Sequence, residues 1–376
     1  MGNDSNYSPR YHGQHLAIFL PSMHDGGAER MMLNLLLGIA NRGYTIDLVL
    51  AKSEGPHLVD VPKSIRLIDL KASRVVTSLP GLMRYLHEVR PHAILSIMNH
   101  ANIVALLAQR LSGIPTRVLV SERNTLSIAA QHARTWRAQF MPWLVRIFYP
   151  LANEIVAVSN GVADDLACIM SIPRQTIKVI YNPVVTPELR QKVIAPLDHP
   201  WFKPGQPPVI LGVGRLTQQK DFATLIQAFA RALRTHQARL VILGEGPERS
   251  ALEALVKRLG LEQVVNLPGF VANPYVYMSR ASLFVLSSRW EGLPGVLIEA
   301  LFCGALVVST DCPSGAREIL ANGRYGQLVP VGDEAEMARA IENALLGEYP
   351  HPPLESWHPF KLETVVDQYL ELLLGN

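Results

Sequence analysis

The stretch SLFVLSSRWEGLPGVLIEALFCG (residues 282–304) predicts one strand, one loop and one helix in succession. The apolar run 282–288 is typical of a buried strand, and RWEG then makes a turn. Pro294 suits the first position of a helix that carries VLIEALFCG. Buried strands that alternate with helices indicate a parallel sheet with helices on both faces.

The same alternation recurs along the chain and predicts an α/β protein. Prolines crowd residues 182–208, where the alternation stops before it restarts, so we expect a connection between domains there. Two Rossmann-like domains with parallel sheets facing an interdomain cleft follow from this pattern. The expected helices are 30–43, 221–235 and 247–259. The expected strands are 16–22, 44–51, 93–99, 117–122, 154–159, 208–214, 238–244, 264–269, 282–288, 305–310 and 326–331.

The composition excludes several classes of protein. Of the 376 residues, 48% are hydrophobic and 18% charged, and the net charge of +3 comes without a Lys/Arg block, which speaks against a nucleic-acid partner. Cys168, Cys303 and Cys312 lack CxxC spacing, which favours neither a zinc site nor a disulfide framework. The polar N-terminus lacks the apolar core of a signal peptide. These features predict a cytoplasmic protein.

Residues 91–109 carry no formal charge, so their length alone allows a transmembrane span. Asn99, His100 and Asn102 interrupt the middle of this segment, where hydrocarbon would be driest. A strand followed by a buried helix is the better interpretation.

A cationic loop follows the strand 208–214. Arg215 and Lys220 precede a helix expected near Asp221, and cations beside the free N–H groups of a helix start form an anion site. An ordinary solvated loop with two surface cations explains the segment about equally well. The glycines of ILGEGPE (242–248) permit close approach of a ligand, but a plain turn before a helix starting at Pro247 explains them as well.

Two acids flank the helix start of the opening stretch. Glu291 lies in the loop, and Glu299 lies about one turn into the helix among apolar neighbours that predict its burial. Paired acids occur in glycoside hydrolases, but a carboxylate also accepts two hydroxyl hydrogen bonds and so can hold a diol. The backbone N–H groups of 292–296 favour an anion between the two acids. In the first half, Gly26 and Gly27 begin a helix in the same manner, although a simple glycine turn is as good an explanation.

Five segments together resemble the family-4 retaining glycosyltransferases of the GT-B fold. They are GGAER (26–30), GVGRLTQQKDF (212–222), ILGEGPE (242–248), RWEGLPGVLIEA (289–300) and SGAREIL (314–320). The resemblance covers nearly the whole chain and is strongest over 208–332. It implies an acceptor-binding domain over 1–185, a domain over 186–355 that binds the nucleotide sugar, and a C-terminal helix over 356–376 that crosses back to the first domain.

The resemblance also implies roles for individual residues. Arg215 and Lys220 bind the donor diphosphate and stabilise the leaving group, Glu299 holds the ribose hydroxyls, and Glu291 contacts the transferred sugar. The remaining donor contacts it implies are Gly26, Gly27, Gly214, Gly244, Gly292, Leu293, Pro294, Gly295 and Val296. Family members work without a metal, and no Asp-x-Asp motif occurs in this sequence.

One position departs from the family. Many members carry a histidine after the strand that corresponds to 117–121, whereas this chain has Glu122, Arg123 and Asn124 there. Glu122, or His100 at the end of the preceding strand, is the candidate for the missing catalytic contact. A histidine at a strand end is more often structural.

An aromatic segment, TWRAQFMPWLVRIFYPLA (135–152), combines five aromatic residues with Arg137 and Arg146. This pattern is typical of a helix that docks on an anionic bilayer, and also of an amphipathic helix buried on a sheet. Pro142 argues against one continuous helix. Docking would place the enzyme at the inner face of the cytoplasmic membrane, with a lipid-linked saccharide as acceptor.

The predicted function is transfer of a hexose or N-acetylhexosamine from a nucleotide sugar to a saccharide acceptor in bacterial surface polysaccharide, lipopolysaccharide or glycan assembly. No cofactor is expected besides the nucleotide-sugar substrate. A nucleotide-sugar epimerase of the same architecture and a non-catalytic subunit that binds nucleotide sugars are the alternatives.

Overall fold

The computed structural model describes residues 14–24, 27–133, 135–349 and 351–375. They form two units. Unit 1 contains the described residues up to Val158, Val162–Pro183 and the segment from Leu362 onward, and unit 2 contains Ser159–Gly161 and Val184–Lys361.

Apart from the short segment Ser159–Gly161, the chain passes between the units at 183/184 and 361/362, whereas the sequence predicted boundaries after 185 and 355. Hydrogen bonds explain the difference at the first crossing. Asn34 donates to the Pro183 carbonyl at 3.0 Å and ties it to unit 1, while the Val185 N–H donates to the Phe360 carbonyl at 3.0 Å inside unit 2. The chain therefore changes unit between Pro183 and Val184.

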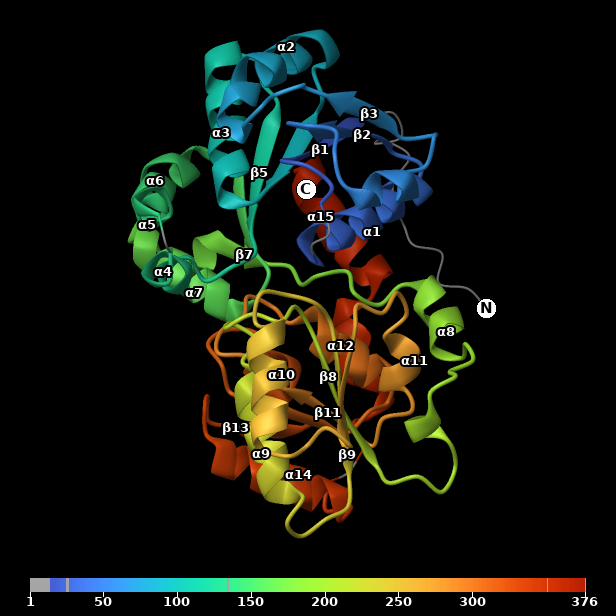
Figure 1. Cartoon of the computed structure of the whole chain (residues 1–376). Coiled ribbons are helices and arrows are strands. Elements are labelled where there is room, and N and C mark those ends of the chain that lie inside the picture. Colours follow the sequence, from blue (N-terminus) through green and yellow to red (C-terminus); the bar gives the residue numbers. More distant parts are fainter. Residues whose placement is uncertain (1–13, 25–26, 134, 350, 376) are drawn as a thin grey trace. The chain divides into compact units, whose positions relative to one another are not determined.

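Unit 1 is built on a parallel sheet of seven strands in the order β3-β2-β1-β4-β5-β6-β7 (Figure 1). The strands are β1 (His15–Leu20), β2 (Thr45–Leu50), β3 (Arg66–Asp69), β4 (Ala93–Ile97), β5 (Arg117–Glu122), β6 (Glu154–Ala157) and β7 (Ile177–Val179). Its helices are α1 (Gly27–Asn41), α2 (Leu79–Val89), α3 (Asn99–Ser112), α4 (Leu126–Gln131), α5 (Trp136–Gln139), α6 (Met141–Phe148), α7 (Asn160–Met170, in unit 1 from Val162 onward) and α15 (Leu362–Leu374).

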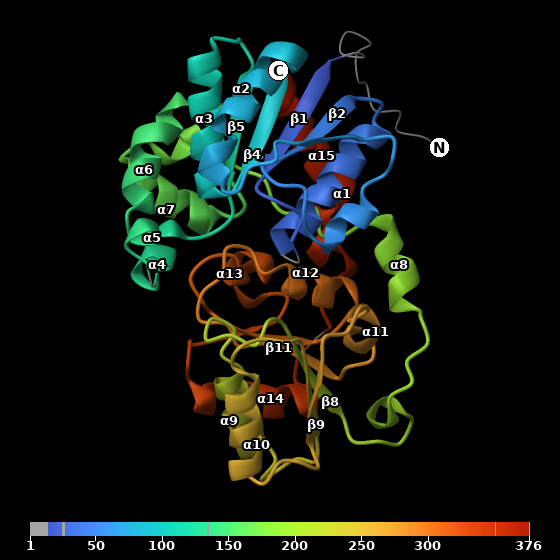
Figure 2. The ribbon, with the colours of Figure 1, turned by 45° about the horizontal axis from the view of Figure 1, so that its top comes forward.

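The C-terminal helix α15 packs beside α1 in unit 1, although the two lie at opposite ends of the sequence (Figures 1 and 2). Gly38 permits this contact, because a Cβ there would lie 2.5 Å from a Val366 methyl group. An ion pair between Arg42 and Asp367, at 2.7 Å, joins the same two helices.

Unit 2 is built on a parallel sheet of six strands in the order β10-β9-β8-β11-β12-β13. The strands are β8 (Val209–Val213), β9 (Arg239–Leu243), β10 (Val265–Gly269), β11 (Leu283–Leu286), β12 (Val307–Thr310) and β13 (Gln327–Val329). The helices are α8 (Pro187–Val193), α9 (Phe222–Ala232), α10 (Arg249–Arg258), α11 (Tyr275–Met278), α12 (Gly295–Phe302), α13 (Ala316–Ile319) and α14 (Glu334–Leu345). Short 3-10 turns in the two units cover Pro56–Asp60, Val75–Ser78, Tyr149–Leu151, Arg174–Thr176, Pro200–Phe202, Ala321–Gly323 and Leu354–Phe360.

One core cluster of unit 2 lies between its sheet and the helices α9, α10 and α14. Ile210 and Ile242 contribute from the strands, and Phe229, Leu255 and Ile341 contribute from the three helices. Burial of these apolar side chains removes them from water and holds the strands in register. The carboxyl ends of the strands are thereby fixed as a rigid edge that carries the loops.

The strand order of both sheets has the reversal typical of a Rossmann-like fold, between β1 and β4 in unit 1 and between β8 and β11 in unit 2. Ligands of such sheets bind outside the carboxyl ends of the strands at this reversal. The loops that follow β8 and β11 are the two that carry Lys220 and Glu291.

Several local predictions are confirmed and others are wrong. Residues 91–109 form β4 and the start of α3, as expected, and no helix among the described residues is long and apolar enough to cross a membrane. Pro294 caps α12 instead of occupying its first turn, and α10 begins at Arg249, two residues after Pro247. The proline-rich connection contains the helix α8, which begins at Pro187 and was not predicted.

Candidate functional site

A lysine and a glutamate meet at the reversal of the unit 2 sheet. Lys220 follows β8 and Glu291 follows β11, and the Lys220 Nζ lies 2.5 Å from the Glu291 Oε1. The Ser288 hydroxyl donates to the same oxygen at 2.6 Å. The two side chains are 17% and 9% exposed, so this ion pair is largely shielded from water. The sequence predicted that both residues lie near one ligand, but not that they contact each other.

Three further side chains join the same two loops. The Gln219 side chain donates from Nε2 to the Trp290 carbonyl at 2.8 Å, and the Gln219 main-chain carbonyl accepts from the Arg289 N–H at 2.8 Å. The Arg289 Nε donates to the Asp221 carboxylate at 2.9 Å. These contacts fix the loop after β8 to the loop after β11, so Lys220 and Glu291 keep their relative positions. The sequence interpretation missed Gln219 and Ser288, whose only signal is their place at strand ends beside the reversal.

The start of α12 presents backbone N–H groups beside Glu291. In the described part of the chain, the N–H groups of Gly292, Leu293, Gly295 and Val296 donate no hydrogen bond to another residue. Pro294 has no N–H, so the prediction that the whole run 292–296 supplies amides is wrong at that residue. Four donors remain at the positive end of the helix dipole, which is where an anion binds.

Glu299 is buried within α12, as its apolar neighbours predicted. The Tyr275 hydroxyl of α11 donates to the Glu299 Oε1 at 3.1 Å and orients the carboxylate. Tyr275 is fully buried and was not identified from the sequence, because its partner lies 24 residues further along the chain.

The loop glycines of unit 2 serve the packing of two loops on each other. Gly244 has φ +143°, and a Cβ there would lie 1.9 Å from the Gly214 carbonyl oxygen. The Gly214 N–H in turn donates to the Leu243 carbonyl at 3.0 Å. The backbone that approaches Gly244 is therefore that of the neighbouring loop after β8, in which Arg215 is exposed.

The predicted contacts of unit 1 lie in three different settings. Gly27 is the exposed first residue of α1, and Gly26 lies outside the described residues. His100 is exposed in the first turn of α3, where its Nδ1 lies 3.1 Å from the Asn99 Oδ1. Glu122, at the end of β5, is only 1% exposed.

The Glu122 carboxylate is occupied by protein groups. Its Oε2 accepts from the Tyr149 hydroxyl at 2.9 Å, and its Oε1 accepts from the Arg123 N–H at 3.0 Å. Asn102 donates to the same Tyr149 oxygen at 2.8 Å and extends the network. Burial raises the pKa of Glu122 to about 7, and the Tyr149 hydrogen bond opposes this effect. These contacts fit a role in which the buried Glu122 supports the carboxyl end of β5. They do not fit a role in which it contacts a sugar directly.

The aromatic segment divides into two helices, α5 and α6, with the break just before Pro142 as predicted. Trp136, Phe140, Trp143 and Ile147 recur at helical spacing and are all exposed, Trp136 at 66% and Trp143 at 59%. Val145 and Tyr149, four residues apart, are fully buried. The segment therefore has a buried side, as an amphipathic helix on a sheet has, and an exposed aromatic side.

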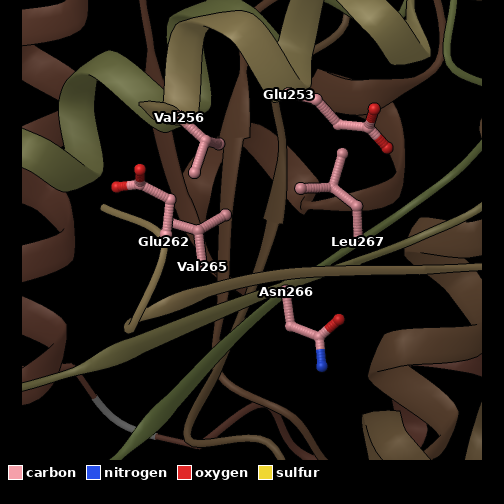
Figure 3. Close-up of a pocket in the computed structure, with 6 residues that line it drawn as sticks. All are labelled: Glu253, Val256, Glu262, Val265, Asn266 and Leu267. Atoms are coloured by element: carbon pink, nitrogen blue, oxygen red, sulfur yellow. The ribbon is translucent and has the colours of Figure 1, made fainter. Parts of the chain in front are cut away.

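A cavity of about 240 Å³ lies elsewhere in unit 2, between α10 and the edge strand β10 (Figure 3). None of the predicted site residues lines it. Its lining residues are Glu253, Val256, Glu262, Val265, Asn266 and Leu267. Within the described ranges, no three His, Cys, Asp or Glu side chains come together as metal ligands.

Two family models match the chain in succession. The model for Glycosyltransferase Family 4 matches residues 25–187, and that for Glycosyl transferases group 1 matches residues 196–357. A relative from Campylobacter jejuni, the N-acetylgalactosamine-N,N'-diacetylbacillosaminyl-diphospho-undecaprenol 4-alpha-N-acetylgalactosaminyltransferase, is 34% identical over 88% of this chain and 90% of its own. The chain belongs to the family-4 glycosyltransferases.

Other comparisons agree with this family. The lipopolysaccharide core biosynthesis glycosyltransferase LpsE of Rhizobium meliloti is 28% identical over 94% of this chain and 97% of its own. The solved lipopolysaccharide outer core galactosyltransferase WaaB superposes with a TM-score of 0.74 at 20% identity, covering 96% of this chain and 99% of that one. Anabaena HepE in complex with UDP superposes at 0.72 and 20% identity, covering 96% and 100%. This family-4 glycosyltransferase thus has the GT-B fold, and the comparisons give no support to an epimerase.

Proposed function

We propose that this glycosyltransferase moves an N-acetylhexosamine or hexose, with retention of configuration and without a metal, from a UDP-sugar to a lipid-linked saccharide. The name of the C. jejuni relative supports the acceptor class and suggests N-acetylgalactosamine as the first sugar to test. The UDP held by the HepE structure supports the choice of nucleotide.

The observation that carries the proposal is the Lys220–Glu291 pair beside four N–H groups at the start of α12 that donate to no other residue in the described part of the chain. A diphosphate needs such a set of fixed donors, and a transferred sugar needs an acceptor for its hydroxyl groups. When the donor binds, the Lys220 ammonium exchanges part of its contact with Glu291 for a phosphate oxygen. The Glu291 oxygen released in this way accepts from a sugar hydroxyl.

The other roles follow from position. Arg215 binds the diphosphate with its guanidinium fork, and Glu299, oriented by Tyr275, accepts from the two ribose hydroxyls. Because Glu122 is buried and bonded to Tyr149, we assign it no substrate contact. His100 is the exposed candidate of unit 1 for the sugar contact.

The chemistry rests on charge stabilisation. As the bond between sugar and diphosphate breaks, negative charge grows on the leaving phosphate, and Lys220, Arg215 and the start of α12 stabilise it without reorganising. Retention follows when the acceptor hydroxyl attacks on the face that the phosphate leaves, and the departing oxygen takes its proton. In this mechanism the side-chain cations of Lys220 and Arg215 take the place of a metal ion.

The exposed stripe of Trp136, Phe140, Trp143 and Ile147 supports docking on a membrane surface, where the lipid-linked acceptor lies. Aromatic side chains of this kind insert at the level of the lipid headgroups. Flotation with vesicles of phosphatidylglycerol and phosphatidylethanolamine tests this step. Trp136→Ser/Trp143→Ser should remain with the soluble fraction, and equal flotation of variant and wild type refutes docking.

The function itself is tested with a panel of UDP-, GDP- and dTDP-sugars. The bound donor should raise the melting temperature by mass action, and EDTA should leave transfer unchanged. Lys220→Ala should lower kcat by about 10²–10³, as loss of a charge-stabilising group does. Lys257→Ala, an exposed lysine of α10, is the matched control. Full activity of both Lys220→Ala and Glu299→Ala refutes the assignment of the site.

A further inference from the structure

Two serine hydroxyls converge on one carbonyl oxygen of the loop that carries Glu291. The Ser159 Oγ lies 2.9 Å and the Ser314 Oγ 2.8 Å from the Gly292 oxygen, and the two hydroxyl oxygens lie 2.7 Å apart. All three residues belong to unit 2. We call Ser159, Ser314 and the Gly292 carbonyl the serine clamp.

The segment 311–318 also contacts the loop that carries Glu291. The Glu291 N–H donates to the Pro313 carbonyl at 3.2 Å. Gly315 lies so close that a Cβ there would be 2.8 Å from the Gly292 oxygen and 2.9 Å from the Leu293 Cα. Most of SGAREIL (314–320) has no role in the proposed donor contacts. Its first residues, Ser314 and Gly315, nevertheless contact the loop that carries Glu291.

The position of Ser159 is itself held. The Glu318 carboxylate accepts from the N–H of Asn160 at 2.9 Å and from its side-chain amide. Both contacts lie within unit 2. The main chain directly after Ser159 is thereby fixed to α13.

Ser314 adopts a backbone conformation that serine rarely takes, with φ +70°. Strain of this kind persists only where the surroundings enforce it, and it concentrates at functional sites. Here the conformation brings the hydroxyl onto the Gly292 oxygen. Gly161 leaves room for it, because a Cβ there would lie 2.9 Å from the Ser314 Oγ.

The direction of the Gly292 carbonyl determines the direction of the next amide. All described peptide bonds are trans, so the Leu293 N–H points opposite to the Gly292 C=O. This N–H is one of the four at the start of α12 that donate to no other residue among those the structure describes. We propose that Ser159 and Ser314 are positioning residues that hold the Gly292–Leu293 peptide so that the Leu293 N–H faces the donor diphosphate. This inference rests on the proposed function.

Ser159 and Ser314 share one acceptor, the Gly292 oxygen. The three oxygen atoms make three close contacts, but the two hydroxyl groups have only two protons to donate. Either hydroxyl can serve the Gly292 oxygen, so each compensates for loss of the other. Single changes to alanine should therefore weaken binding of a diphosphate about threefold, and the double change about 30-fold, which exceeds the product of the two single effects.

The experiment measures Kd by calorimetry for inorganic pyrophosphate and for UDP with the full chain. The variants are Ser159→Ala, Ser314→Ala, the double variant and Ser314→Gly, which removes both the hydroxyl and the backbone strain. Ser309→Ala is the matched control, because its hydroxyl is also buried in unit 2 and also bonds a carbonyl, that of Thr310, at 2.9 Å.

A positioning role predicts that Ser314→Gly folds more stably than Ser314→Ala yet binds pyrophosphate equally weakly. Recovery of wild-type affinity in Ser314→Gly, or wild-type affinity in the double variant, overturns the inference. Wild-type protein that binds neither pyrophosphate nor UDP overturns the proposed function as well. Ser309→Ala should retain the affinity of the wild type.

Discussion

Lys220 and Glu291 should be energetically coupled, so that removing both charges destabilises unit 2 by less than the sum of the two single changes. Lys220→Met leaves a carboxylate that is 9% exposed without its cation, and breaking a shielded pair in this way costs about 3 kcal/mol. Glu291→Gln costs about 1–2 kcal/mol, because the Lys220 ammonium is the more exposed partner and can reach water. The double variant carries no unpaired charge, and we expect it to recover about 2 kcal/mol of the summed single effects.

Differential scanning calorimetry measures this cycle. For a unit of about 150–250 residues, each kcal/mol shifts the melting temperature by about 2–4 °C, so Lys220→Met should lower it by about 6–12 °C. Calorimetry also resolves separate transitions of the two units, which a single-wavelength melt would merge.

An exposed ion pair of the same unit is the control. Arg231 and Glu334 lie 3.1 Å apart with side chains 52% and 27% exposed, and their cycle should give a coupling of about 0.5 kcal/mol that disappears in 1 M salt. The Lys220–Glu291 coupling should survive this salt concentration. Additive effects of Lys220→Met and Glu291→Gln would refute the view that the pair is a coupled, shielded unit.

Three further changes test separate contacts. Burial raises the pKa of Glu122 from 4.5 to about 7, so the folded chain holds a proton that the unfolded chain releases, and stability falls as pH rises through this window. Relative to wild type, Glu122→Gln should therefore gain about 3 kcal/mol between pH 4.5 and 7 in urea unfolding, and a constant difference contradicts this. Gly315→Ala places a Cβ 2.8 Å from the Gly292 oxygen at a φ of +81°, so it should weaken UDP binding at least tenfold in calorimetry, whereas unchanged affinity shows that the loop can yield. Tyr275→Phe removes the 3.1 Å hydrogen bond to Glu299 and should raise KM for the donor about fivefold with kcat unchanged, and a fall in kcat alone contradicts the proposed ribose contact.

The neighbourhood of the donor site could be predicted from the sequence because it depends on the order of elements. The carboxyl ends of parallel strands share one edge, so Lys220 after one strand and Glu291 after another must lie near each other once the strand order is Rossmann-like. The periodicity of apolar residues sufficed for that conclusion. Whether the Lys220 and Glu291 side chains touch depends on the hydrogen bonds that Ser288 and Gln219 make, and no rule of residue spacing predicts those bonds.

For a related reason, the sequence could not predict contacts between residues that lie far apart along the chain. Ser159 lies 133 residues from Gly292, and nothing in EIVAVSN marks its hydroxyl as the partner of a particular carbonyl. Glu122 is a second case. It was a candidate because it occupies the position of a family histidine, but it closes a strand whose residues from Val118 onward are buried, and Tyr149 draws its carboxylate into the interior.

The spacing of Glu291 and Glu299 follows from the geometry of a helix start. A catalytic pair that cleaves sugars needs one carboxyl that keeps its proton and gives it to the leaving oxygen. Here donors surround both groups instead: the Lys220 ammonium and the Ser288 hydroxyl at Glu291, and the Tyr275 hydroxyl at Glu299. A carboxylate that already accepts from fixed donors is held in place to accept further hydrogen bonds from hydroxyl groups of a ligand. The intervening residues end the loop and begin α12, so the N–H groups of this helix start lie between the two acids along the chain. The proposed contacts then follow in the order sugar, diphosphate, ribose that a nucleotide sugar presents.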